Sequence, residues 1–153
     1  KNDSAFAHLT AQFKAHTVNK TYVALVRGHP SPASATIEAP IGRSRRNRKR
    51  MAVVEDGRES KTNYRVTTVF THCSLLEAIP ITGRTHQIRV HLASIGHPII
   101  GDTTYGKSHS DLNRQFLHAT SLEFRLPSTN ALVLFTNPLP LELSRFVKSL
   151  QPR

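Results

Sequence analysis

The stretch ITGRTHQIRVHLASIGHPIIGDTTYG, residues Ile81–Gly106, combines two arginines, three histidines and four glycines in a short span. Its apolar residues recur at positions i, i+4 and i+7, which is the spacing of one helix face. These apolar positions are Ile88, Leu92 and Ile95. We therefore predict one short helix over residues 85–95, preceded by a strand that ends near the start of the stretch.

Local signals predict both ends of this helix. Thr82 or Thr85 can cap the start, because a side-chain oxygen there can accept from a backbone N–H that lacks a helical partner. Gly96 follows the last apolar position, where a residue with positive φ is favoured, and Pro98 comes soon after. Arg84 is thereby placed where a strand ends and a helix begins. Functional residues are common on such connections, because a rigid scaffold holds them in place.

Five segments of the chain together resemble the signature of the RluA-type RNA pseudouridine synthases. They are Thr82–His91 (TGRTHQIRVH), Gly96–Pro98, Gly101–Asp102, Lys20–Val26 (KTYVALV) and Leu117–Ala119. The resemblance covers most of the chain. It implies the pseudouridine synthase catalytic fold and the isomerisation of uridine to pseudouridine in RNA. It also implies that neither a metal nor an organic cofactor takes part, since the reaction is redox-neutral.

One part of the family pattern has no counterpart in this sequence. The family carries its catalytic aspartate in a His-Arg-Leu-Asp segment followed by Thr-Ser-Gly. None of the aspartates present stands in that context; they are Asp3, Asp56, Asp102 and Asp111. The chain does not begin with Met, and its first residues resemble the stretch just after the missing segment. We therefore expect residues 1–153 to be a single partial catalytic domain, inactive alone.

The resemblance assigns catalytic roles to two residues. Arg84 matches the family arginine that pairs with the catalytic aspartate, and a guanidinium suits this role because it stays charged and offers two parallel donors. Tyr22 matches the family tyrosine that stacks on the uracil base. From its pattern alone, Tyr22 is equally explained as a core aromatic residue on a strand. Apolar neighbours such as Ile88 or Leu117 are candidates for the lining of the pocket.

The composition favours a polyanionic partner. The chain has 153 residues, a formal net charge of +11 and a pI near 10.7. That length fits one domain, and such a charge suits nucleic acid or an anionic surface. The single cysteine, Cys73, fits a reducing cytoplasm and is predicted to be a buried, inert thiol. No apolar run is long enough to span a membrane, so no transmembrane helix is expected. We expect the protein to be cytoplasmic and a monomer.

A basic arm at residues 43–50 (RSRRNRKR) carries six positive charges in eight positions. A solvated loop or a nuclear import signal would have the same composition. We predict instead that the arm contacts RNA phosphates, because such a charge density is hard to keep ordered without a polyanion. The predicted RNA-binding residues are Arg43, Arg45, Arg46, Arg48, Lys49, Arg50, His86 and Arg89.

The remaining pattern predicts an α+β domain with a large, mainly antiparallel mixed sheet and peripheral helices. An amphipathic helix is expected at the start of the chain, and a last helix is expected to turn an apolar face inward through Leu143, Phe146, Val147 and Leu150. Residues 71–74 are predicted to form a turn, and residues 35–41 a returning strand. The predicted helix 5–14 is followed by strands at 20–28, 35–41, 61–71, 75–81, 116–126 and 131–135.

Other chemistries are less well supported by the sequence. His86 and His91 lie about 140° apart on a helix of 3.6 residues per turn, and no zinc-ligand spacing is present, so no metal site is expected. A nuclease using histidine and lysine would need a second catalytic partner that no spacing indicates. The stronger alternative is a non-catalytic RNA-binding module, which needs no active site. For the synthase, ribosomal RNA is favoured over transfer RNA as the substrate.

Overall fold

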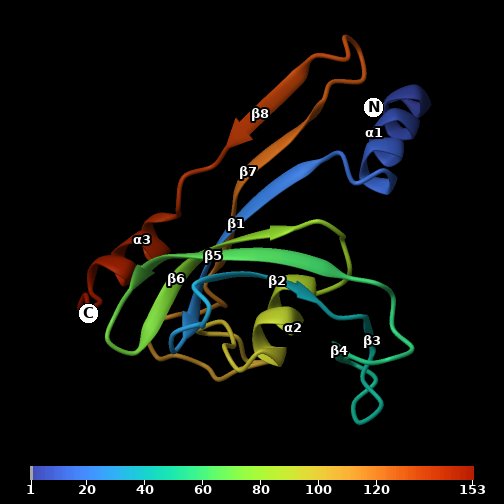
Figure 1. Ribbon diagram of the computed structural model, residues 1–153. Coiled ribbons are helices and arrows are strands. Elements are labelled where there is room, and N and C mark those ends of the chain that lie inside the picture. The colour runs from blue at the N-terminus through green and yellow to red at the C-terminus, as the bar shows by residue number, and fades with distance from the viewer. Residues whose placement is uncertain (1) are drawn as a thin grey trace.

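A computed structural model describes residues 2–153, which form one six-stranded sheet, a small two-stranded sheet and three helices (Figure 1). Most elements begin and end within a few residues of the ranges predicted from the sequence. In chain order they are α1 (Asp3–Lys14), β1 (Asn19–Arg27), β2 (Ser34–Glu38), β3 (Ile41–Arg43), β4 (Met51–Val53), β5 (Lys61–Val69), β6 (Cys73–Pro80), α2 (Gln87–Ser94), β7 (Leu117–Arg125), β8 (Leu132–Thr136) and α3 (Leu141–Lys148).

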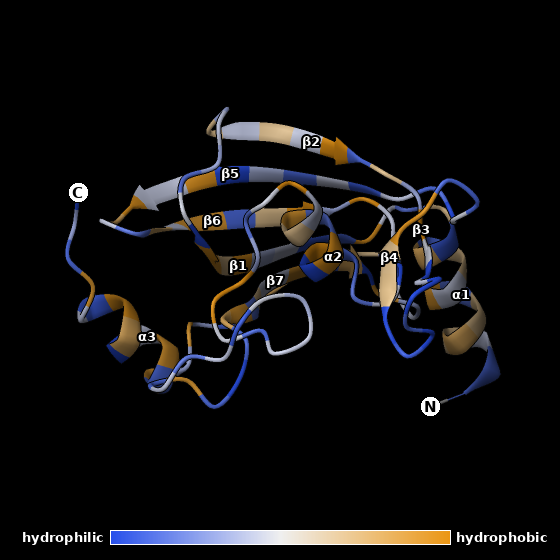
Figure 2. Cartoon of the chain, turned by 90° about the horizontal axis from the view of Figure 1, so that it is seen from below, coloured by the Kyte–Doolittle hydropathy of each residue, from blue (hydrophilic) through white to orange (hydrophobic). Residues whose placement is uncertain are grey.

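The large sheet has the strand order β2-β5-β6-β1-β7-β8. Every pairing between its strands within residues 2–153 is antiparallel, which confirms the predicted α+β class with a mainly antiparallel sheet. Strand β1 lies between β6 and β7, and its Tyr22 is paired with Ala78 on one side and Ala119 on the other. Helix α2 packs on the sheet beside β4, β5 and β6, as Figure 2 shows from below.

The core forms between the central strands, α2 and the segment that returns from α2 to β7. Its largest fully buried side chains are Phe116, Leu25, Leu76, Leu92, Ile99 and Leu143. Strand β6 alternates between buried and half-buried residues, as a strand with one face on the core should. The returning segment joins the end of β1, because Ile100 N–H donates to Leu25 O at 2.9 Å and Phe116 N–H donates to Ile100 O at 2.8 Å. This contact fixes the position of Asp102.

Two expectations about the strands are wrong. The strand predicted at 35–41 forms as β2, but it pairs with β5 and not with β1, the strand it follows in the chain. The predicted turn at 71–74 is shorter, because Cys73 and Ser74 already belong to β6. Both residues are buried, so burial of the strand end extends the pairing beyond the polar residues that suggested a turn. Burial also raises the pKa of the Cys73 thiol, consistent with the predicted inert side chain.

The start of α2 also differs from the prediction. The helix spans Gln87–Ser94, two residues later than expected, and its N-cap residue is His86 with φ of 57° and no side-chain cap hydrogen bond. Neither Thr82 nor Thr85 caps it. The Thr82 hydroxyl instead donates to Gln87 Oε1 at 2.7 Å, because the side chain of the first helical residue folds back toward the preceding loop. At the other end, Gly96 has the predicted positive φ, at 84°.

The terminal helices differ in how much they bury. Helix α3 buries Leu143 and Phe146, with Val147 and Leu150 packed against the core, as predicted. Helix α1 forms as predicted but contains no buried residue, and Phe6 is 74% exposed. Gln12 ties α1 to β7 by accepting from Arg125 N–H at 2.8 Å. No helix within residues 2–153 is both long enough and apolar enough to cross a membrane.

Candidate active site and RNA interface

A cleft of about 520 Å³ opens where β1, the β6–α2 connection, α2 and the start of β7 meet. It collects four residues that were singled out from the sequence: Tyr22, Arg84, His86 and Arg89. Ile88 and Leu117, the predicted apolar neighbours, also line it. The basic arm lies outside this cleft, on the β3–β4 hairpin. The chain therefore separates a cleft with candidate catalytic groups from a charged surface beside it.

Arg84 is half-buried on the wall of the cleft. Its Nε–H donates to Glu59 O at 3.0 Å, which orients the guanidinium. Within residues 2–153, no carboxylate oxygen lies within 4.0 Å of it. A half-buried guanidinium without a counter-charge is suited to bind an anion, because partial burial weakens the screening by water.

Gln87 holds the loop that carries Arg84. Its Oε1 accepts from Arg84 N–H at 2.9 Å and from the Thr82 hydroxyl. Its Nε2 donates to Lys61 O and to Thr62 Oγ1, both at 2.9 Å. The amide is buried and all four of its hydrogen bonds are made. The Gln87 side chain thus links the backbone of Arg84 to strand β5 and fixes its position.

The same network continues from Thr62 to His91. His91 is fully buried, and its Nε2 lies 2.9 Å from Ala39 O while its Nδ1 lies 2.8 Å from Thr62 Oγ1. A carbonyl only accepts, so Nε2 carries the proton and Nδ1 accepts from the Thr62 hydroxyl. Burial lowers the pKa of His91, although the bond to Ala39 O opposes this shift. A neutral imidazole therefore completes the chain of hydrogen bonds to the Arg84 loop.

Tyr22 lies half-buried on β1 and contributes its ring to the cleft while also packing against the core. The register of β1 against β7 shifts between Thr21 and Tyr22. Such an irregularity bends a strand locally and re-aims its side chains, and it is common next to active sites. The two roles proposed from the sequence, core aromatic and base-stacking residue, are therefore compatible in one side chain.

Arg89 is bound to a carboxylate that the sequence prediction did not assign to it. Its Nε and Nη2 donate to the two oxygens of Asp102, each at 2.7 Å. The Asp102 side chain is fully buried and the Arg89 side chain is 13% exposed. Burial alone would raise the pKa of Asp102, but the bonds from Arg89, Tyr105 N–H and Thr104 N–H outweigh burial and lower it. The positive charge of Arg89 is thus compensated, whereas that of Arg84 is not.

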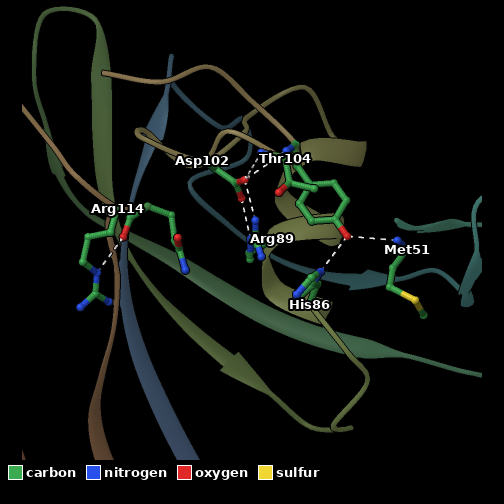
Figure 3. A network of polar contacts seen from close by, with 8 residues as sticks. Met51, His86, Arg89, Asp102, Thr104 and Arg114 are labelled. Atoms are coloured by element: carbon green, nitrogen blue, oxygen red, sulfur yellow. Dashed lines mark hydrogen bonds and ion pairs between the residues drawn. The ribbon is translucent and has the colours of Figure 1, made fainter. Parts of the chain in front are cut away.

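His86 connects the cleft to the arm through Tyr105. Its Nδ1 lies 2.9 Å from the Tyr105 phenol oxygen, a contact that Figure 3 marks with a dashed line from His86. Met51 N–H, at the start of β4, donates to the same oxygen at 3.1 Å. Burial and the nearby Arg89 charge lower the pKa of His86, while Asp102 acts in the opposite direction. His86 is exposed within the cleft, so its other nitrogen can face a ligand.

The basic arm is the turn of an ordered hairpin. Ser44 N–H donates to Arg50 O at 2.9 Å and Arg50 N–H donates to Asn47 O at 2.9 Å. The charged side chains of the arm are exposed, and so is the ion pair that Arg45 forms with Asp56 at 3.4 Å. Figure 2 shows this hairpin as a hydrophilic projection next to β4. The predicted RNA contacts of Arg43, Arg45, Arg46, Arg48, Lys49, Arg50, His86 and Arg89 stay predictions.

Three residues of the site were not recognised from the sequence, namely Gln87, Asp102 and Tyr105. All three lie inside or next to the motif that carried the resemblance, so position alone could have suggested them. Their roles depend on partners up to 54 residues away in the chain, as with Tyr105 and Met51.

No group of three or more His, Cys, Asp or Glu side chains that could hold a metal ion occurs in the described part of the chain, residues 2–153.

Comparison with known proteins identifies the family. The model of the RNA pseudouridylate synthase family matches residues 1–94 of the chain. The chain belongs to this family. Its RluA-type character, expected from the motifs around Arg84, is supported by relatives named ribosomal large subunit pseudouridine synthase C and D. The family assignment and the fold predicted from the sequence are both confirmed.

Relatives align along the whole chain. A protein of Chloroflexus aurantiacus described as an uncharacterized RNA pseudouridine synthase is 49% identical to this chain. The aligned region covers 100% of this chain and 49% of that protein. The ribosomal large subunit pseudouridine synthase D of Zymomonas mobilis is 43% identical, covering 98% of this chain and 50% of its own length. The chain therefore spans about half the length of the curated relatives it matches.

Solved structures agree with the fold. The human RNA pseudouridylate synthase domain containing 1 protein superposes with a TM-score of 0.82 at 31% identity, over 99% of this chain and 66% of that one. The human domain containing 4 protein gives a TM-score of 0.76 at 23% identity, which shows the shared fold alone. The six-stranded sheet with α2 on its face is thus the architecture that this chain shares with its family.

Proposed function

We propose that this chain is the part of an RNA pseudouridine synthase that supplies the arginine, the base-stacking tyrosine and an RNA-binding arm. The substrate is a uridine in structured RNA, and ribosomal RNA is favoured over transfer RNA. The names of two relatives, which specify the large ribosomal subunit, support that choice. The observation that carries the proposal is the cleft itself, because it brings Tyr22 and the uncompensated Arg84 together.

The reaction sets demands that this cleft meets in part. The bond from C1′ of the ribose to N1 of uracil breaks, the base turns, and C1′ bonds to C5, which then loses its hydrogen. The uridine must leave its stack, and a carboxylate must act at the nucleoside. A cation must keep that carboxylate ionised in a partly desolvated pocket. Arg84 supplies the cation, and Tyr22 supplies a flat surface for the detached base.

The bonds of Arg84 leave it prepared for this role. Because Nε–H is engaged by Glu59 O, the two terminal nitrogens are left to bind an incoming carboxylate. Gln87 fixes the backbone of Arg84, so little conformational freedom is lost when the pair forms. Within this proposal the carboxylate comes from the family's His-Arg-Leu-Asp segment, which none of the four aspartates of the chain matches.

Release of tritium from RNA labelled at C5 of uridine tests the proposed activity. The full-length protein that contains this chain is expected to release tritium, because C5 exchanges its hydrogen for the ribose. Residues 1–153 alone are expected to stay at background, since no aspartate stands in the catalytic context. Release well above background by residues 1–153 would contradict the assignment of the nucleophile, and no release by the full-length protein would contradict the proposed activity.

A non-catalytic RNA-binding module is the second candidate function. The exposed charge of the ordered β3–β4 hairpin favours it, because phosphate binding needs no reacting group. This alternative predicts that the full-length protein binds RNA and forms no pseudouridine. The tritium assay, combined with a binding measurement on the same RNA, therefore separates the two candidates.

The arm is expected to give RNA affinity that depends strongly on salt and little on sequence. Each phosphate contact on single-stranded RNA adds roughly 0.7 to the slope of log K against log salt concentration. Replacing Arg45, Arg46, Arg48 and Arg50 with Gln should flatten that slope by about two to three units. Binding titrations from low to high salt measure it.

A matched control uses exposed cations at the other end of the molecule. Arg145 and Lys148 lie on α3 and Arg153 follows it, away from the β3–β4 hairpin in Figure 1. Their replacement with Gln should leave the slope close to that of the unaltered protein. An equal flattening by both sets would mean that net charge, rather than the arm, governs RNA affinity.

A further inference from the structure

Tyr105 lies behind the cleft and contacts two of the residues that line it. Its ring faces the Arg89 guanidinium, with 4.9 Å from Cζ to the ring centroid, and meets the His86 imidazole edge-on at 5.7 Å between centroids. Its backbone N–H donates to Asp102 Oδ1 at 3.0 Å. Tyr105 itself does not line the cleft. Any influence it has on a bound uridine must therefore act through its neighbours.

The phenol oxygen joins two segments that are distant in the chain. Met51 N–H donates to it at 3.1 Å, and His86 Nδ1 lies 2.9 Å away (Figure 3). A phenol oxygen can accept one hydrogen bond and donate another, so the same hydroxyl can serve both Met51 N–H and His86 Nδ1. Met51 directly follows Arg50, the last residue of the basic arm. One hydroxyl thus connects the base of the arm to the start of α2.

The aromatic ring and the hydroxyl have separable effects. The ring covers the buried Arg89–Asp102 pair, whereas the hydroxyl alone connects the arm to His86. The two strands of the hairpin, β3 and β4, are only three residues long each. Such a short two-stranded ribbon is marginal by itself. On the β3 side the hairpin is held by Ile41, which is buried and exchanges two hydrogen bonds with Arg58. On the β4 side, the Tyr105 hydroxyl is the group that ties the end of the arm to a residue of the cleft.

We propose that Tyr105 is a positioning residue, whose hydroxyl holds the basic arm at a fixed orientation to the cleft so that RNA bound by the arm presents its uridine to Arg84 and Tyr22. This inference rests on the proposed function. The arm supplies affinity and the cleft supplies chemistry, and the hydroxyl of Tyr105 is the contact that relates their positions. Its loss lowers the fraction of bound RNA that is correctly placed, because the arm can then turn without leaving the RNA.

The substitution Tyr105→Phe in the full-length protein removes the hydroxyl and keeps the ring on Arg89. We expect kcat at saturating RNA to fall by about five- to tenfold, the loss that follows when one hydrogen bond between positioned groups is removed. The Kd for RNA should change by less than about twofold, because every phosphate-binding cation is retained. Tyr64→Phe is the matched control. Its phenol is also hydrogen-bonded to a backbone group, here as the donor to Pro32 O at 2.9 Å, but Tyr64 lies on β5 away from the arm and the cleft.

Hydrogen exchange tests the hold on the arm without any need for catalysis. The amides of Ser44 and Arg50 close the hairpin through bonds that do not involve Tyr105. Their exchange should become about fivefold faster in Tyr105→Phe and stay unchanged in Tyr64→Phe. Unchanged exchange at both amides in Tyr105→Phe would overturn the proposal, because the arm would then be held by other contacts.

A double-mutant cycle decides whether the effect on turnover passes through the arm. In a protein whose four arm arginines, at 45, 46, 48 and 50, are replaced by Gln, Tyr105→Phe should no longer reduce kcat. The same five- to tenfold reduction in both backgrounds would overturn the proposal, since Tyr105 would then act on the cleft alone. If the unaltered protein forms no pseudouridine, the proposed function is rejected instead, and the exchange rates still decide whether Tyr105 holds the arm.

Discussion

Arg84→Met in the full-length protein is expected to abolish nearly all pseudouridine formation while RNA binding falls little. Methionine keeps the length and the apolar stem of the side chain and removes the charge. The carboxylate that pairs with Arg84 would then lie in a pocket built to hold it ionised without its counter-charge. Removing one partner of a buried pair costs about 3–5 kcal/mol. The carboxylate should respond with a raised pKa, which lowers its reactive fraction at neutral pH.

Two further variants test the specificity of this effect. Arg84→Lys should restore turnover only in part, because an ammonium group cannot reproduce a two-pronged contact. Arg114→Met is the matched control, since Arg114 lies beside the cleft but is exposed and already donates to Leu117 O at 2.7 Å. Its turnover at saturating RNA should stay close to that of the unaltered protein. Near-normal turnover of Arg84→Met would mean that Arg84 is an RNA contact or a structural group.

The two arginines of the motif show what sequence reasoning can and cannot resolve. Both carry the same side chain five residues apart, and the resemblance to the family assigned the catalytic role to Arg84. The partner of each is decided by tertiary structure. Asp102 reaches Arg89 because the segment after α2 returns to the end of β1. Gly101 permits this return, since it has φ of 77° and a side chain there would collide with Arg114 O.

Elements with a strong local pattern were predicted well, and those with a non-local cause were not. Strand β6 and helix α3 show clear periodicity, and both form close to the predicted residues. The pairing of β2 with β5 could not be read from either strand, because register and partner depend on burial of both faces. The hairpin β3–β4 was missed because its strands are short and the charges between them suggested an irregular loop.

The early start predicted for α2 has a similar cause. Thr82 and Thr85 are good capping residues by type, but the first helical residue, Gln87, binds the Thr82 hydroxyl and Arg84 N–H with its own side chain. A buried amide that satisfies two loop groups and two groups of β5 competes with the ordinary cap. The hydrogen bonds of the Gln87 side chain fix the loop that carries Arg84. The departure from the local rule thus occurs at the candidate active site.

Asp102→Asn is expected to cause a large loss of stability. The Asp102 carboxylate is fully buried and accepts from Arg89 twice and from Thr104 and Tyr105 N–H. Asparagine keeps the shape but removes the charge and turns one acceptor into a donor that faces the guanidinium. Breaking a buried pair in this way costs about 3–5 kcal/mol. Urea unfolding of the full-length protein measures it.

The pH dependence of stability gives an independent check of the same pair. In the folded protein the pKa of Asp102 lies below its ordinary value of 3.8, so the ionised form is stabilised by folding. This stability is fully present above the unfolded pKa and is lost as pH falls through the folded pKa. The unaltered protein should therefore lose stability steeply below about pH 4, and Asp102→Asn should lose less over the same range.

Asp111→Asn, at a side chain 71% exposed, is the matched control and should change stability by less than about 0.5 kcal/mol. If Asp102→Asn cost no more than that control, the Arg89–Asp102 pair would not be what holds the returning segment, and the position of Tyr105 behind the cleft would have to depend on its ring contacts alone.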